Sequence, residues 1–277
     1  MKQPGLIHLL VTTVKLSVVL TLLPIHIALA ATFEHAPWDA LLGKYVAVSE
    51  SGSVSQVDYG GFGSDRQLLK AYLNDLARVS RDEFERWSVN EQLAFLINAY
   101  NAWTVELVLS HYPGIESIRD IGFLFSSPWK QPIIELFGEQ VSLDDVEHGM
   151  IRGWGRYNEP RIHFAVNCAA IGCPALRAEA YVGERLEQQL QDSTEKFLSH
   201  RSRNRFERGR LYVSRIFDWY EEDFERGWNG IQSVEQFLAE YSQQLGLNED
   251  LRSRLLSGEI RIRYLRYDWG LNQLAPN

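Results

Sequence analysis

The chain has 277 residues, of which 45% are hydrophobic and 23% charged, and its formal net charge is −8. This apolar content excludes a mainly disordered chain, and a mean hydropathy of −0.23 with one long apolar stretch excludes a multi-span membrane protein. The acidic balance, with no basic block, argues against nucleic acid as a partner.

Residues 1–30 have the pattern of a secretory signal peptide. Two lysines supply positive charge, residues 16–23 form an uncharged apolar run, and the segment ends in the small-residue pattern Ala28-Leu29-Ala30. The alternative is an uncleaved anchor helix, but the apolar part is shorter than the ~20 residues that span a bilayer. We therefore expect cleavage near Ala30/Ala31, a periplasmic or secreted location, and no stable membrane span afterwards.

Apolar spacing predicts three helices in the next part of the chain. A short helix at residues 38–45 and a loose segment at 50–55 precede a second helix, which Ser64 or Asp65 can cap. The apolar positions of this second helix are Leu68, Leu69, Tyr72, Leu73 and Leu76. The third helix begins with a capping box formed by Ser88 and Glu91. Apolar residues cover most of its circumference, so we expect it to be buried in the middle of the fold.

The remaining elements alternate irregularly between strands and helices. We predict a hairpin at 132–141, helices at 143–151 and 181–198, strands at 161–167 and 211–213, helices near 219–224 and 234–245, and a strand at 259–267. No linker separates them. The pattern predicts a single helix-rich α+β domain over residues 31–277, built around a small, mostly antiparallel sheet.

Cys168 is the first candidate for chemistry. It follows the predicted strand at 161–167, a place where the chain turns and can offer a nucleophile to a cleft. The alternatives are a buried inert cysteine or one half of a structural disulfide with Cys173, which becomes plausible after export.

Several polar side chains precede Cys168. His163 and Asn167 share one face of the predicted strand, so His163 could act as a general base while Asn167 or Glu147 orients its ring or holds an oxyanion. His148 is a second candidate base, although it points about 100° away from Glu147 on a helix. For either histidine, a packing or surface role is the alternative.

Four further residues are candidates for substrate binding, and Cys173 is one of them. Arg161 could clamp an anionic group, or could form an internal ion pair instead. Asn98 and Asn101 lie in a strongly apolar helix, so their buried amides must find partners in a neighbouring loop or in the floor of a site. Trp219-Tyr220 and Trp269 are expected in the core. Zinc ligand types are present, but their spacing matches no compact motif, and we expect no metal or cofactor.

Five stretches of the sequence resemble the domain of unknown function 547 family. They are residues 94–101 (AFLINAYN), 142–148 (SLDDVEH, with Arg152), 160–174 (PRIHFAVNCAAIGCP), 217–224 and 267–272. The resemblance covers nearly all of the chain after residue 30, with Ala175 where a second proline is expected. It implies an exported bacterial protein and supports a polar site at these residues, but it implies no particular reaction.

Together these residues favour an exported cysteine-dependent hydrolase or acyl transferase, with a papain- or transglutaminase-like arrangement. Cys168 would be the nucleophile, His163 or His148 the base, and Glu147 or Asn167 the orienting group; the substrate would be a small molecule or a peptide.

Two other functions remain open. The first is a non-catalytic binding module of the cell envelope in which Cys168 and Cys173 form a structural disulfide. The second is a thiol redox protein that uses the same pair, although its spacing differs from the thioredoxin motif.

Overall fold

A computed structural model describes residues 32–122 and 127–275 of the chain. The predicted signal peptide lies outside the described residues. The fold is α+β, as predicted: it is rich in helices and contains two two-stranded hairpins and one three-stranded sheet. No helix among the described residues is long and apolar enough to cross a membrane.

The helix α5 (Val89–Leu109) occupies the centre of the N-terminal part. Its capping box is formed as predicted, because Ser88 accepts from the Glu91 amide and the Glu91 side chain accepts from the Ser88 amide. Every residue from Gln92 to Leu109 is buried except Trp103, which is half-buried. The prediction of a central helix that is apolar on nearly all sides is therefore confirmed.

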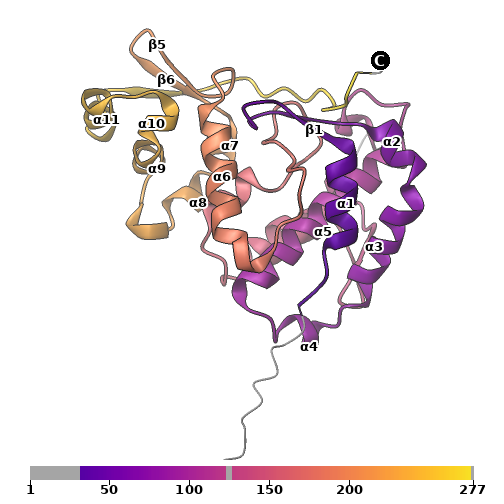
Figure 1. Ribbon diagram of the computed structural model, residues 1–277. Helices are drawn as coiled ribbons and strands as arrows, with labels where there is room; N and C mark the ends of the chain where they lie inside the picture. The colour runs from indigo at the N-terminus through magenta and orange to yellow at the C-terminus, as the bar shows by residue number, and fades with distance from the viewer. Residues whose placement is uncertain (1–31, 123–126, 276–277) are drawn as a thin grey trace, which may run out of the picture. The chain divides into compact units, whose positions relative to one another are not determined.

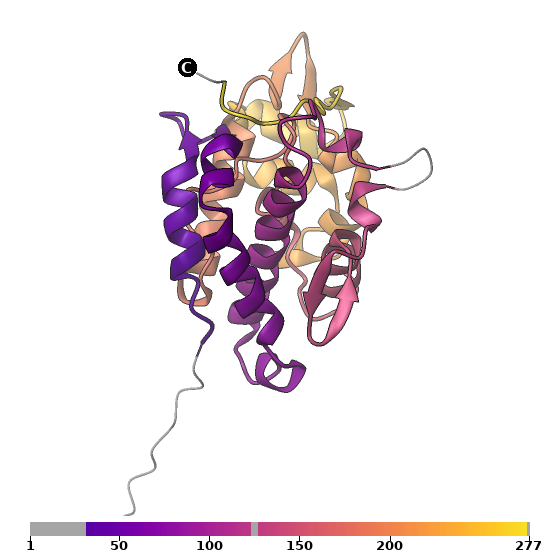
Figure 2. The same ribbon diagram turned by 90° about the vertical axis from the view of Figure 1, so that its right-hand side faces the viewer.

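Four helices lead into α5 and help to bury it. They are α1 (Ala36–Tyr45), α2 (Tyr59–Ser64), α3 (Arg66–Arg78) and α4 (Arg81–Phe84), with the hairpin strands β1 (Val46–Val48) and β2 (Ser55–Val57) between α1 and α2. Figure 2 shows the longer helices side by side along one face of the molecule. Leu68 was expected on the apolar face of α3, but it is 57% exposed. The buried stripe starts at Leu69, which is about 100° further round the helix.

The middle of the chain contains the predicted hairpin. Its strands are β3 (Ile134–Leu136) and β4 (Glu139–Val141), and the turn between them has positive φ at both Phe137 and Gly138. Two-residue turns of this kind match the twist of paired strands. The predicted helix after Ser142 is present, but residues Asp145–Ile151 form a π-helix, η3. Short 3₁₀ segments, η1 (Ile118–Asp120) and η2 (Pro128–Lys130), precede the hairpin.

The predicted strand at residues 161–167 is wrong. Residues Pro160–Phe164 form a 3₁₀-helix, η4, that Pro160 opens and whose Arg161 amide donates to the Glu159 side chain. The apolar and polar residues alternate in this segment, yet all of them are buried. The alternation therefore does not mark two faces of a strand, and Arg161 and His163 do not share a strand face.

The C-terminal part is built on a second hydrophobic cluster. Its elements are η5 (Gly183–Arg185), α6 (Leu186–Ser199), β5 (Arg205–Glu207), β6 (Arg210–Val213), α7 (Ile216–Trp219), α8 (Glu221–Glu225), η6 (Trp228–Gly230), α9 (Val234–Glu240), α10 (Ser242–Leu245), α11 (Glu249–Leu256) and β7 (Arg261–Tyr264). Strand β6 pairs antiparallel with β5 and parallel with β7 (Figure 1). Phenylalanines from η4, α6, α7, α8 and α9 fill the cluster.

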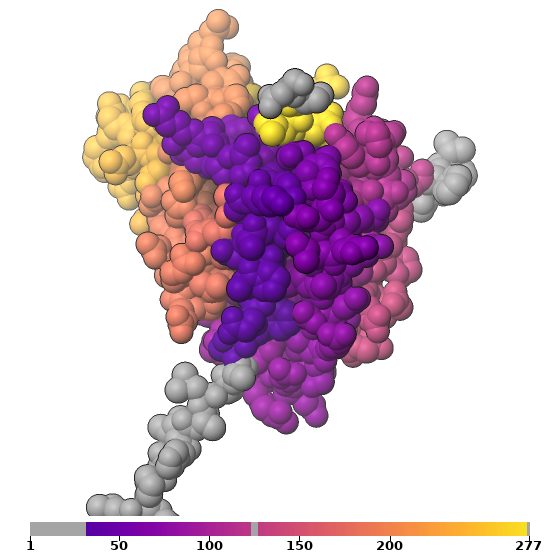
Figure 3. All heavy atoms as spheres, turned by 45° about the vertical axis from the view of Figure 1, so that its right-hand side comes forward, coloured from indigo at the N-terminus to yellow at the C-terminus, as the bar shows by residue number. Residues whose placement is uncertain are grey.

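The segment after β7 crosses back to the N-terminal part. Its backbone pairs with the loop after η4, where the Gly172 amide donates to the Asp268 carbonyl at 2.8 Å and the Asn272 amide donates to the Ala169 carbonyl at 3.0 Å. It then reaches β2, since the Val57 amide donates to the Asn272 carbonyl. In Figure 3 these yellow atoms lie against the indigo and purple N-terminal part. The crossing places residues near position 270 beside Cys168 and Cys173.

Candidate functional site

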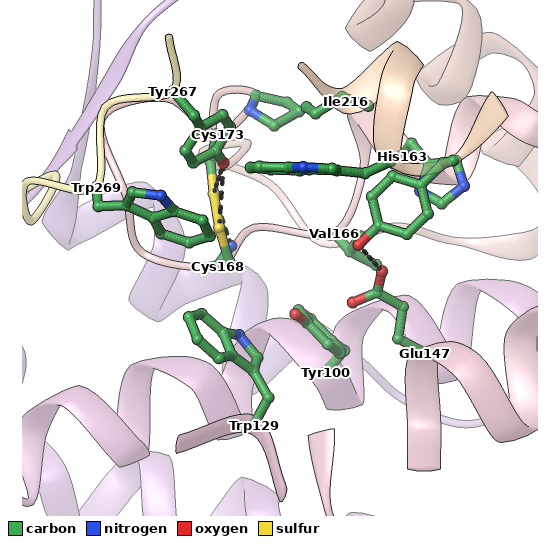
Figure 4. Close-up of a pocket in the computed structure, with 13 residues that line it drawn as sticks. Tyr100, Trp129, Glu147, His163, Val166, Cys168, Cys173, Ile216, Tyr267 and Trp269 are labelled. Atoms are coloured by element: carbon green, nitrogen blue, oxygen red, sulfur yellow. Dashed lines mark hydrogen bonds between the residues drawn. A yellow bond between two sulfur atoms is a disulfide. The ribbon is translucent and has the colours of Figure 1, made fainter. Parts of the chain in front are cut away.

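A pocket of about 210 Å³ lies where the loop after η4 meets the C-terminal segment (Figure 4). Its walls come from α5, η2, η3, η4, α7 and the C-terminal segment. The lining residues are Tyr100, Trp129, Glu147, His163, Val166, Cys168, Cys173, Pro174, Ile216, Trp219, Tyr220, Tyr267 and Trp269.

The two cysteines are joined by a disulfide at one end of this pocket. Their Cα atoms are 6.2 Å apart. The Cys173 sulfur is buried and accepts hydrogen bonds from the Cys168 amide at 3.0 Å and from the Tyr267 hydroxyl at 3.2 Å. Cys168 is half-buried, and its sulfur lies 3.3 Å from the same hydroxyl. Neither cysteine is a free thiol in this structure.

Buried amides hold the loop that carries the disulfide. Asn167 accepts from the Ala169 amide at 2.9 Å and donates to the Pro174 carbonyl at 2.7 Å, and so it spans the loop. Asn101 of α5 donates to the Ala165 carbonyl and accepts from the Asn167 amide. Ala169 has a φ of 61°, a left-handed conformation that residues other than glycine rarely adopt. These contacts fix the position of Cys168 relative to α5.

His163 is paired with a carboxylate that the sequence reasoning missed. Its Nε2 lies 2.7 Å from Asp223 of α8, which also accepts from Arg152. Burial lowers the pKa of His163 and outweighs the hydrogen bond to Asp223, which favours the neutral ring. Burial alone would raise the pKa of Asp223, but the hydrogen bonds from His163 and Arg152 outweigh it and lower the pKa. The pair is therefore a neutral imidazole against an ionised carboxylate.

Glu147 supplies a buried carboxylate to the same pocket. Its Oε1 accepts from the Tyr220 hydroxyl at 2.8 Å, and the Tyr220 ring stacks on His163 with centroids 3.8 Å apart. Burial and the charge of Glu147 together raise the pKa of Tyr220 and of Tyr100, so both phenols stay protonated. In Figure 4, Glu147 and His163 lie at the opposite end of the pocket from the disulfide.

Aromatic rings form the wall that connects the two ends. Trp219 stacks on Trp269 at a centroid distance of 5.6 Å, Tyr267 lies 4.6 Å from Trp269, and Trp129 meets Trp269 edge-on at 5.7 Å. Trp219 is 43% exposed, although the sequence reasoning placed it in the core. The wall is therefore accessible, and it offers flat apolar surface with few polar atoms.

Residues 84–198 match the family model described as "Protein of unknown function, DUF547". The match covers less than half of the chain. Comparisons with curated proteins and with solved structures found no match. The matched residues include both cysteines, His163 and Glu147, whereas Trp219, Tyr267 and Trp269 of the pocket lie beyond position 198.

Four of the predicted site residues line this one pocket: Cys168, Cys173, His163 and Glu147. The other predicted residues lie outside the pocket lining. His148 is exposed on η3, and its Nδ1 lies 2.7 Å from Arg152.

The remaining four predicted residues are engaged within the fold, and Asn167 is one of them, since it spans the disulfide loop. Arg161 is buried between Glu159 and Glu187, so it forms the internal ion pair that was one of the two expectations. The Asn98 side chain forms hydrogen bonds with the backbone carbonyl and amide of Tyr181. The Asn101 side chain forms hydrogen bonds with backbone groups of Ala165 and Asn167. Among the described residues, no group of three metal-ligand side chains is arranged to hold a metal ion.

The residues that the sequence reasoning missed are separated from the DUF547 motif by long stretches of chain. Asp223 lies 60 residues after His163, and Tyr267 lies 99 residues after Cys168. The resemblance gave one indication of Asp223 and Tyr267, because they lie in residues 217–224 and 267–272, two of the stretches that resemble the family. The residue types in those stretches did not indicate which side chains would reach the site.

Proposed function

We propose that the protein is an exported ligand-binding module and that the pocket beside the disulfide binds a small molecule with a flat or acyl apolar body. The observation that carries the proposal is the pocket itself: tryptophan and tyrosine rings connect a disulfide at one end to the Glu147 carboxylate at the other. Apolar walls with a few fixed polar groups are typical of small-molecule sites.

The state of the cysteines supports binding rather than covalent catalysis. A nucleophilic cysteine acts as a thiolate, and both sulfurs here are bonded to each other. Such a bond supports an oxidising compartment, in agreement with the signal-peptide pattern at residues 1–30. The disulfide then acts as a wall of the pocket whose position Asn167 and Tyr267 hold.

Titration with a neutral fluorescent arylamine, N-phenyl-1-naphthylamine, tests this proposal. We expect saturable one-to-one binding to the unreduced protein, and at least about fivefold weaker binding by Trp219→Ala, because an aromatic contact contributes about 1 kcal/mol beyond the area that it buries. Trp228→Ala is the matched control, since Trp228 packs over Arg161 and lies outside the pocket lining. Absence of saturable binding, or equal loss in both variants, would overturn the proposal.

A second candidate is the cysteine-dependent hydrolase or acyl transferase. The observation in its favour is that Cys168 and His163 line one pocket and that His163 is paired with Asp223. This reaction requires reduction of the disulfide first. Reduced protein would then release one equivalent of p-nitrophenol from p-nitrophenyl acetate in a burst that Cys168→Ala abolishes and Cys173→Ala retains. No burst above that of the Cys168→Ala variant would exclude this candidate for acyl esters.

A further inference from the structure

An open cleft of about 710 Å³ adjoins the aromatic wall of the pocket. Trp219, Tyr267 and Trp269 line both the pocket and the cleft, so the two spaces share one wall. The other lining residues of the cleft are charged: Arg119, Arg215, Arg266 and Asp268. These charged side chains therefore lie next to the aromatic rings that line the pocket.

The cleft is positively charged, although the chain as a whole is acidic. Three guanidinium groups face one carboxylate there, whereas the whole chain has a formal charge of −8. Asp268 is already engaged, since its Oδ1 accepts from the Gly270 amide at 2.9 Å. Arg215 is partly neutralised by Asp218 at 3.1 Å. The cleft thus keeps a net positive charge.

The other two arginines keep their charge available. Arg119 lies over the Trp269 ring, with Cζ 5.2 Å from the centroid, so its guanidinium is held at the edge of the shared wall. Within residues 32–122 and 127–275, Arg119 and Arg266 make no ion pair. Guanidinium groups bind carboxylate, sulfonate and phosphate oxygens through paired N–H donors.

We propose that the cleft binds the anionic head of the ligand whose apolar body lies against the aromatic wall. The ligand class is then an amphipathic anion: an aryl or acyl group that carries a carboxylate, sulfonate or phosphate. This inference rests on the proposed function, because it assumes that the pocket takes an apolar body. It adds the charge of the ligand and the three arginines that select it.

Two probes with the same arylamine skeleton test the charge directly. N-phenyl-1-naphthylamine is neutral, and 1-anilinonaphthalene-8-sulfonate adds one sulfonate. We expect the unreduced protein to bind the sulfonate at least about tenfold more tightly at low salt, a difference of about 1.4 kcal/mol, since charge-assisted hydrogen bonds are stronger than neutral ones. In the Arg119→Gln/Arg215→Gln/Arg266→Gln variant the ratio of the two dissociation constants should fall below about threefold.

A second triple variant controls for net charge. Arg78→Gln/Arg208→Gln/Arg254→Gln removes three exposed arginines that lie outside the cleft, and it should keep the preference for the sulfonate.

Two outcomes separate the two proposals. If both probes bind equally and in a Trp219-dependent way, and the cleft variant changes neither, the inference is wrong and the proposed function stands. If neither probe binds in a Trp219-dependent way, the proposed function fails, and the inference fails with it. An equal loss of sulfonate binding in both triple variants would also overturn the inference, because it would reflect net charge alone.

Discussion

At the scale of single residues, the disulfide defines the character of the site. The Cys173 sulfur receives two hydrogen bonds, and the loop around it is spanned by Asn167, so the bridge is built into the wall. A cross-link stabilises a fold chiefly because it restricts the unfolded chain, and short loops contribute less than long ones.

We predict that Cys168→Ala combined with Cys173→Ala lowers the free energy of unfolding by about 2 kcal/mol, because the bridge closes a short loop with a sequence separation of 5. Urea denaturation of the oxidised wild type and the double variant measures this difference. Equal midpoints and slopes would show that the bridge contributes nothing to stability.

A second residue-scale prediction concerns acid sensitivity. His35 is buried, its Nδ1 lies 2.7 Å from the Tyr72 hydroxyl, and burial lowers its pKa from 6.5 to about 3. The unfolded chain therefore binds a proton between pH 6.5 and 3 that the folded chain does not, so stability falls as the pH falls through this window.

Replacement of His35 by asparagine removes the side chain that takes up this proton in the unfolded chain. We expect His35→Asn to reduce the loss of stability between pH 6 and 4 by about 1.4 kcal/mol per pH unit, whereas His163, whose pKa is also lowered, contributes equally in both proteins. Urea denaturation at several pH values tests this, and an unchanged pH slope would contradict it.

The residue types of the site could be read from the sequence, but their partners could not. Cys168 stands out because a thiol can act as a nucleophile or form a cross-link, and His163 and Glu147 stand out because ionisable side chains are seldom fully buried. Asp223 and Tyr267 reach the site only through the tertiary fold, 60 and 99 residues away along the chain. The arginines of the cleft come from η1, the start of α7 and the segment after β7, and no local pattern links them.

At the scale of elements, the predictions succeeded where interactions between residues close together in the sequence determine the structure. The capping box of α5 and the turn of the β3–β4 hairpin depend on residues three or four apart, and both are confirmed. The prediction of a strand at 161–167 failed because a strand needs a partner strand. Residues 160–164 instead form a 3₁₀-helix whose apolar and polar side chains are all buried. The π-helix η3 likewise carries no sequence signal that we could use.

The contact between η5 and α5 gives an element-scale prediction. A Cβ at Gly183 would lie 2.3 Å from the Glu91 Cγ and 2.9 Å from the Glu91 amide nitrogen, which belongs to the first turn of α5. We expect Gly183→Ala to lower the free energy of unfolding by about 1–3 kcal/mol, because the backbone of η5 must move away.

Gly63 provides the matched control for this substitution. A Cβ there would meet nothing within 4 Å, and Gly63 lies within α2. Gly63→Ala should therefore leave stability unchanged or raise it by up to about 1 kcal/mol, since alanine favours the helix. Thermal or urea denaturation of both variants compares them, and equal effects would contradict the assigned contact.

At the scale of the whole molecule, the site exists because the chain returns on itself. The segment after β7 lies across the loop after η4 and continues to β2, so it joins the first and last parts of the described chain. That crossing brings the exposed aromatic wall, the arginine cleft and the disulfide together. A ligand pocket at such a meeting of distant segments is a general feature of binding sites.

The most direct test of the account is the titration of the unreduced protein with N-phenyl-1-naphthylamine, repeated after reduction. The account predicts saturable binding in the oxidised state and a dissociation constant that changes less than about threefold on reduction, because Asn167 and Asn101 still hold the loop. Absence of binding in the oxidised protein, with binding or acyl-ester turnover that appears only after reduction, would contradict it. Cys168 would then be a nucleophile rather than part of a wall.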